Sequence, residues 1–185
     1  MKKFVIALIF ALVTCISYSQ VSIGKLVRFP DSNFIGLAGK PQLGFTKFDE
    51  NNFITLRTCQ GYSYASFDND SRILIRFADE TIVKLPMIGK LGVSKDFYTE
   101  VISGKVYSYY ITYTQYEIDE ETINKITVEK VPIIKIRVAF SNGNVTDYDI
   151  KPGYQQKLLD GLIKSYNDAT SQNEIRKANN TDDDF

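Results

Sequence analysis

Apolar and polar residues alternate over much of the chain, and this alternation predicts a sheet built from β-hairpins. Segments 73–85 and 136–148 each alternate about a polar turn, Ala78–Glu80 in the first and Ser141–Gly143 in the second. A period of two is that of a strand that buries one face. The two hairpins lie 63 residues apart and suggest an internal repeat, although any two amphipathic hairpins share this much.

Charged side chains select the register of the second hairpin. A three-residue loop with Gly143 in a left-handed bulge pairs Arg137 with Asp147 and Lys135 with Asp149, and it gathers the apolar residues on the opposite face. A two-residue turn would instead set both aspartates opposite apolar residues, which is unfavourable. We therefore predict the three-residue loop and a salt-paired outer face.

The first hairpin favours the same register. It pairs Ile75 with Val83 and Ile73 with Leu85, so that the apolar residues share a face. Glu80 then takes the loop position that a glycine occupies in the second hairpin. Both hairpins are predicted to be core elements rather than functional sites.

Three further strands are predicted before the first hairpin. They are Val21–Phe29, Phe53–Thr58 and Tyr62–Phe67, each apolar or alternating. A stretch rich in glycine and proline, residues 36–44, is predicted to be an irregular connection.

A longer hairpin, Phe97–Ile102 and Lys105–Glu117, carries several of the 12 tyrosines of the chain. A two-residue turn at Ser103–Gly104 sets Tyr98 opposite Tyr109. Alternation then places four tyrosines on one face, beside Glu100 and Lys105: Tyr98, Tyr107, Tyr109 and Tyr113. Because tyrosine supplies both ring area and a directional hydroxyl, this face is the candidate binding surface. The alternative is that the C-terminal helix covers the face and the rings belong to the core.

Two helices are predicted in the C-terminal half. Asp119 is a favourable N-cap for a short helix, and Ile118 can pack on Ile123. Tyr154–Ala169 is the main helix, and its apolar stripe should lie on a sheet. The stripe consists of Leu158, Leu159, Leu162, Ile163 and Tyr166. The acidic tail, residues 170–185, has little to bury and is expected to be disordered.

Together these elements predict one α+β domain over residues 20–169: an antiparallel sheet built from hairpins, one short helix, and a C-terminal amphipathic helix packed on the sheet. The segments Tyr116–Glu121 and Ile133–Arg137, with the closing helix from Gln155, resemble a class of small exported proteins of Gram-negative bacteria with no assigned activity. The resemblance spans Tyr107–Ala169 and implies the fold and an export route.

The N-terminus is typical of an export signal. Lys2–Lys3 precede the apolar run Phe4–Val13, and small residues in Ser17–Ser19 stand where signal peptidase cleaves. We expect residues 1–19 to be removed and the mature protein to work in the periplasm or outside the cell. The alternative is a lipoprotein anchored through Cys15. No later apolar run is long enough to span a membrane.

The composition of the chain excludes several kinds of chemistry. It has no histidine, no tryptophan, and 22 basic against 22 acidic residues without a basic cluster. Histidine-dependent catalysis and the common histidine-containing zinc sites are thereby excluded, and the charge footprint of a nucleic-acid binder is missing. Cys59 is the single cysteine after signal removal and is expected to be buried and inert. We expect no metal or cofactor, since Asp68–Ser71 lacks the later residues of a calcium loop.

These patterns favour a non-catalytic envelope protein that binds another envelope protein or a ligand through a sheet surface or edge. The alternative is a small hydrolase of envelope polymers that uses carboxylates or tyrosine. Its carboxylates would have to converge across a cleft, and the candidates are Glu100, Glu117, Asp147 and Asp149. Asp147 and Asp149 already have basic partners in the predicted hairpin, so a salt-paired surface is the preferred interpretation.

Overall fold

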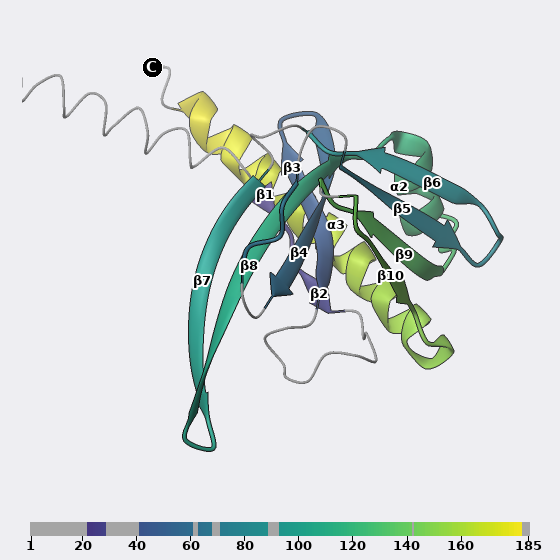
Figure 1. Cartoon of the computed structure of the whole chain (residues 1–185). Coiled ribbons are helices and arrows are strands. Elements are labelled where there is room, and N and C mark those ends of the chain that lie inside the picture. The colour runs from purple at the N-terminus through teal and green to yellow at the C-terminus, as the bar shows by residue number, and fades with distance from the viewer. Residues whose placement is uncertain are drawn as a thin grey trace, which may run out of the picture.

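The protein folds into two antiparallel sheets and two helices. The computed structural model describes residues 22–28, 41–60, 63–67, 71–88, 93–141 and 143–182. The predicted signal peptide, Cys15, residues 36–40 and Asp68–Asp70 lie outside the described residues. The predicted α+β class, with antiparallel sheets built from hairpins and a C-terminal helix packed on them, is confirmed (Figure 1).

The larger sheet combines the N-terminal strands with the tyrosine-rich hairpin. Its strands are β1 (Ser22–Ile23), β2 (Val27–Arg28), β3 (Gln42–Phe48), β4 (Asn51–Gln60), β7 (Val93–Ile102) and β8 (Lys105–Glu117). They lie in the order β1-β3-β4-β8-β7, and β2 also pairs with β3. The last strand of this order, β7, therefore forms an edge of the sheet.

The smaller sheet contains the two hairpins predicted as a possible repeat. Its strands are β5 (Arg72–Phe77), β6 (Ile82–Pro86), β9 (Ile133–Ala139) and β10 (Val145–Asp149), in the order β10-β9-β5-β6. The first strands of the two hairpins pair with each other, with Ile75 opposite Ile136. The hairpins thus lie side by side in one sheet. A bridge between Met87 and Tyr116 joins this sheet to β8 of the larger one.

The predicted registers of these hairpins are confirmed. Arg137 lies opposite Asp147 in the second hairpin, and the pairs in the first hairpin are those that the same loop requires. Gly143 has φ 78° and Glu80 has φ 69°. Both hairpins therefore place a left-handed residue at the same point of the loop, and the first does so with a residue that carries a side chain.

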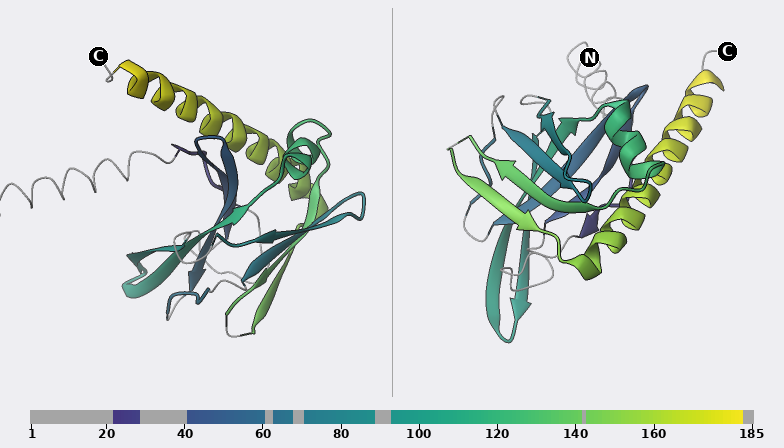
Figure 2. Two further views of the ribbon diagram at one scale, coloured as in Figure 1. Left: turned by 90° about the horizontal axis from the view of Figure 1, so that it is seen from above. Right: turned by 90° about the vertical axis from the view of Figure 1, so that its right-hand side faces the viewer.

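Two helices complete the fold. The first, α2 (Glu120–Thr127), begins after Asp119, whose Oδ1 accepts a hydrogen bond from the Thr122 N–H at 2.7 Å. The second, α3 (Pro152–Asp182), has 31 residues, roughly 46 Å at 1.5 Å per residue. It lies along one side of the two sheets, against β3, β1 and β2, and also contacts β9 and α2 (Figure 2). No helix within the described residues is long and apolar enough to cross a membrane.

The main core lies between the two sheets and α3. Phe45 and Tyr166 meet there edge to face, with ring centroids 5.2 Å apart. Residues of both sheets and both helices are buried together: Leu43, Phe45, Ile54, Leu56, Ile75, Phe77, Ile123, Ile136, Leu158 and Leu162. The predicted stripe of α3 therefore does pack against a sheet.

The C-terminal helix is longer than the sequence predicts. The expectation of a disordered tail from residue 170 is wrong for residues 170–182, which continue α3; residues 183–185 lie outside the description. Asn173 is 2% exposed, and its Nδ2 donates to the Asp49 carbonyl at 2.9 Å. Arg176 forms an ion pair with the Asp49 carboxylate at 2.8 Å. Polar contacts with the turn between β3 and β4 thus hold the end of the helix.

Two strand predictions near the N-terminus are also corrected. Within the predicted strand Tyr62–Phe67, residues 63–67 form no strand. Tyr64 instead packs edge to face on Tyr110, with centroids 5.1 Å apart. The predicted strand Val21–Phe29 is divided into β1 and β2, separated by Gly24–Leu26. A Cβ on Gly24 would lie 2.0 Å from the backbone oxygen of Ser165, so only glycine fits where the chain passes α3 at this point.

Candidate functional site

The outer part of the β7–β8 hairpin projects beyond the rest of the larger sheet (Figure 1). The last residue pair between β8 and β4 is Tyr110 with Gln60, so β8 residues before Tyr110 pair only with β7 among the described strands. We call residues 97–109 the arm. Its turn residues, Ser103 and Gly104, have φ of 52° and 75°, which is the backbone of the two-residue turn predicted from the sequence.

The arm exposes apolar side chains on both faces. Val101 and Val106 lie opposite each other near the turn and are 68% and 70% exposed. Phe97, on the same face, is 49% exposed. On the other face, Tyr98 and Tyr107 are each 42% exposed. Singly exposed apolar residues are ordinary, but Val101 and Val106 are exposed cross-strand neighbours, so the arm is a candidate interaction surface.

The four predicted tyrosines share one face, as the register requires, but they differ in exposure. Tyr98 and Tyr107 are exposed, whereas Tyr109 and Tyr113 pack in a small cluster. Tyr98 lies opposite Tyr109, and the two rings stack with centroids 5.7 Å apart. Tyr109 is only 9% exposed. It forms a small second cluster with Cys59 and Ile111, against which Tyr113 also packs. The accessible part of the predicted face is therefore Tyr98 and Tyr107.

The cluster around Tyr109 is separate from the helix. The main neighbours of α3 are β3, β1, β2, β9 and α2, none of which belongs to the arm. The alternative prediction, in which the C-terminal helix covers the tyrosine face, therefore does not explain the burial of Tyr109. Cys59 is 4% exposed, as the sequence predicts, and burial raises the pKa of its thiol.

The carboxylates considered for hydrolysis come from both sheets, Glu100 and Glu117 from β7 and β8 and Asp147 and Asp149 from β10. Asp147 accepts from Arg137 at two atoms, Nε at 2.6 Å and Nη2 at 2.7 Å, and Lys135 lies 3.0 Å away. Lys135 also contacts Asp149 at 3.4 Å. Hydrogen bonds from Arg137, with the nearby Lys135, lower the pKa of Asp147 well below its usual range. Glu117 ends β8 in the other sheet. The outer face of the β9–β10 hairpin therefore carries the predicted salt pairs.

The most deeply buried of the described tyrosines, Tyr116, is unsuited to nucleophilic catalysis. Tyr116 is fully buried, and its hydroxyl lies 3.2 Å from the hydroxyl of Thr114, which donates to it. Burial raises the pKa of Tyr116 to about 12. Such a hydroxyl is harder to ionise than free tyrosine and is sealed from substrate, which is the reverse of what a nucleophile needs. Among the described residues, no group of three His, Cys, Asp or Glu side chains could hold a metal ion.

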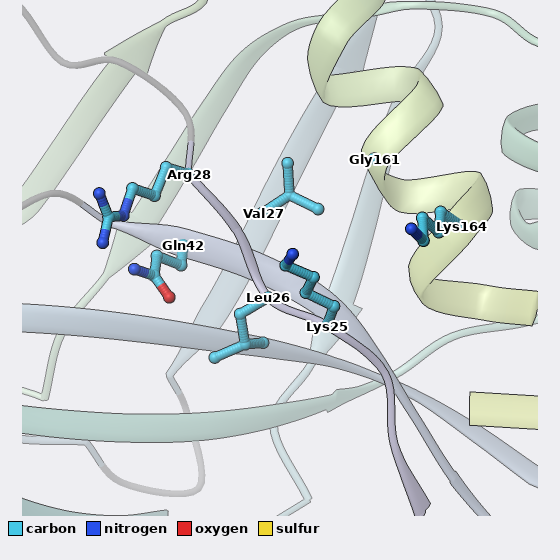
Figure 3. Close-up of a pocket in the computed structure, with 7 residues that line it drawn as sticks. All are labelled: Lys25, Leu26, Val27, Arg28, Gln42, Gly161 and Lys164. Carbon is cyan, nitrogen blue, oxygen red and sulfur yellow. The ribbon is translucent and has the colours of Figure 1, made fainter. Parts of the chain in front are cut away.

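A second surface feature is an open cleft between β2 and α3 (Figure 3). Its volume is about 530 Å³. Three cationic side chains line it, Lys25 and Arg28 from the segment around β2 and Lys164 from α3. Its other described lining residues are Leu26, Val27, Gln42 and Gly161. Sequence reasoning missed this cleft because its cations come from segments more than 100 residues apart.

Comparison of the chain with protein-family models, curated proteins and solved structures finds no match in any of the three.

Proposed function

We propose that this chain is an exported, non-catalytic protein of the cell envelope that binds a partner protein through its arm. The observation that carries the proposal is the exposure of Val101 and Val106, 68% and 70%, at the end of a projecting ribbon. The tyrosine pair Tyr98 and Tyr107 extends this apolar surface onto the opposite face. Burial of such groups against a partner would remove apolar area from water, which is the main favourable term in association.

The edge position of β7 supports the same proposal. An edge strand presents unpaired backbone N–H and C=O groups, which an extended segment of a partner can complete. Charged residues usually protect such edges, and Lys95 and Asp96 do so near the body of the sheet. From Phe97 to Ile102 the strand carries one charge, Glu100. The outer half of β7 is thus the part best suited to strand addition.

The arm can be tested by substituting its exposed valines with lysine. Val101→Lys with Val106→Lys should abolish capture of a partner from envelope fractions, identified by mass spectrometry. Each change should alter the unfolding free energy by no more than about 0.5 kcal/mol, because both positions are solvent-exposed.

A matched control uses two apolar residues exposed elsewhere. Ile82 and Val128 are 61% and 69% exposed and lie outside the arm. Ile82→Lys with Val128→Lys adds the same charge and should leave partner capture intact. Equal capture by both double variants, with both folded, would contradict the role of the arm.

Export rests on the N-terminal pattern and has its own test. Intact-mass measurement of the exported protein should give a mature chain that begins at Gln20, since small residues at Ser17 and Ser19 precede that position. A lipid-modified Cys15 at the N-terminus would instead establish the lipoprotein alternative.

A further inference from the structure

We propose that the cleft between β2 and α3 binds a small anion that carries an apolar group, such as an alkyl phosphate or an alkyl carboxylate. This inference is independent of the arm. It rests on three properties of the cleft: its size, three cations that form no ion pair among the described residues, and two apolar lining residues.

The cleft has the dimensions of a ligand site. Its volume of about 530 Å³ falls within the range of roughly 300–1,000 Å³ that is typical of small-molecule sites. In Figure 3, Arg28 and Gln42 stand at one end, Lys164 at the other, and Lys25 between them. A ligand in the cleft would therefore contact both the N-terminal segment and the C-terminal helix.

The three cations of the cleft have no acidic partner within ion-pair distance in the described part of the chain. Lys25, Arg28 and Lys164 form no ion pair within the described part of the chain, and no described lining residue is acidic. Lys135 and Arg137 on the smaller sheet, by contrast, are both paired with Asp147. Three cations on one concave surface attract an anion more strongly than scattered lysines do, because their potentials add.

Two apolar residues that line the cleft could contact the apolar part of such a ligand. Leu26 and Val27 are half-buried there and present hydrocarbon between the cations. Gly161 lets α3 approach Val27, since a Cβ on Gly161 would lie 2.6 Å from Val27 Cγ1. Gln42 adds an amide that can donate a hydrogen bond to an anionic oxygen. Cations over an apolar floor match an amphiphilic anion better than a free inorganic one.

Nuclear magnetic resonance titration of the full chain with octyl phosphate and octanoate tests the proposal. Saturable shifts should centre on the amides of residues 25–28 and 161–164 for at least one of the two probes, and the probe that binds identifies the headgroup. Lys25→Gln with Lys164→Gln should weaken binding of that probe at least about tenfold, because each lost cation removes a charge-assisted contact.

A control variant of equal net charge separates local binding from general attraction. Lys84 and Lys151 are exposed, form no ion pair with another described residue and do not line the cleft. Lys84→Gln with Lys151→Gln should change affinity no more than about twofold, since distant surface charges are screened. The proposal fails if neither probe gives saturable shifts at the cleft, or if both double variants weaken binding equally. It also fails if inorganic phosphate or neutral octanol binds as well as the amphiphilic anion.

Discussion

Ser165 lies where α3 contacts the larger sheet, and its substitution by alanine should destabilise the fold. The serine is fully buried, and its Oγ accepts a hydrogen bond from the Phe45 N–H at 2.8 Å. Phe45 needs this acceptor because the edge of β3 is interrupted there: β1 pairs with Thr46 and Lys47, whereas β2 pairs with Gln42 and Leu43. The helix hydroxyl fills the gap in the ladder.

The expected size follows from two opposing effects. Leaving a buried N–H without an acceptor costs about 1–3 kcal/mol. Alanine is a better helix former than serine by roughly 0.5 kcal/mol. Ser165→Ala should therefore lower the unfolding free energy by about 0.5–2.5 kcal/mol, and the melting temperature by about 1–10 °C for a chain of this length.

Equilibrium unfolding in urea measures the change, and Ser171→Ala is the control, because Ser171 is exposed on the same helix. The control should be neutral or slightly stabilising. Gly24→Ala tests the contact from the other side. Its Cβ would lie 2.0 Å from the Ser165 backbone oxygen, which no rotamer change can relieve. A Ser165→Ala midpoint equal to that of the control would refute the reasoning.

Three further predictions concern the helix end, the thiol and one surface carboxylate. Truncation before Asn173 should lower the melting temperature by several degrees, because the buried bond from Asn173 to the Asp49 carbonyl is lost; an unchanged melt would mean that the tail does not dock. Cys59 should react with a thiol reagent far more slowly in the folded protein than in urea, since the thiol is buried and its pKa is raised; equal rates would contradict its burial. Hydrogen bonding to Lys125 lowers the pKa of Asp79 to about 2. The stability that this carboxylate contributes is complete above about pH 4 and is lost as the pH falls towards about 2, so melting curves of Asp79→Asn should lack that part of the acid dependence.

The hairpins could be predicted because several local signals agree on them. The alternation fixes which face is buried, and the pairing of Arg137 with Asp147 excludes the register in which an aspartate faces the core. Gly143 then supplies the left-handed loop residue. Glu80 shows that pairing can impose this conformation on a less suited residue, here with the help of an ion pair to Arg76.

The end of α3 could not be predicted, because its stability is not local. Residues after Ala169 carry no apolar stripe, and a polar segment of this kind is ordinarily disordered. What holds it is the turn at Asp49, more than 120 residues earlier in the chain. The strand prediction for residues 63–67 was wrong for a similar reason. Its aromatic residues resemble a strand, but Tyr64 packs onto the sheet through its ring rather than joining it through its backbone.

In the candidate sites too, the features set by neighbouring residues could be predicted, whereas those set by distant segments could not. The shared face of the tyrosines follows from turn geometry, so it was predictable. The burial of Tyr109 depends on Cys59 of β4, which alternation within the hairpin does not reveal. The cationic cleft exists only because α3 brings Lys164 to the segment that carries Lys25 and Arg28.

The core does not require Val101 and Val106, the two exposed valines of the arm. A two-stranded ribbon on its own is marginally stable in water, and Val101 and Val106 contribute little buried area to hold it, since more than two thirds of each lies in solvent. Lysine or glutamate at these positions would protect the edge against unwanted pairing at little cost to the fold. The chain does place charges at Glu100 and Lys105 beside the turn, yet it keeps both valines. Apolar residues that neither fill the core nor protect the edge are the reason for our proposal that a partner covers them.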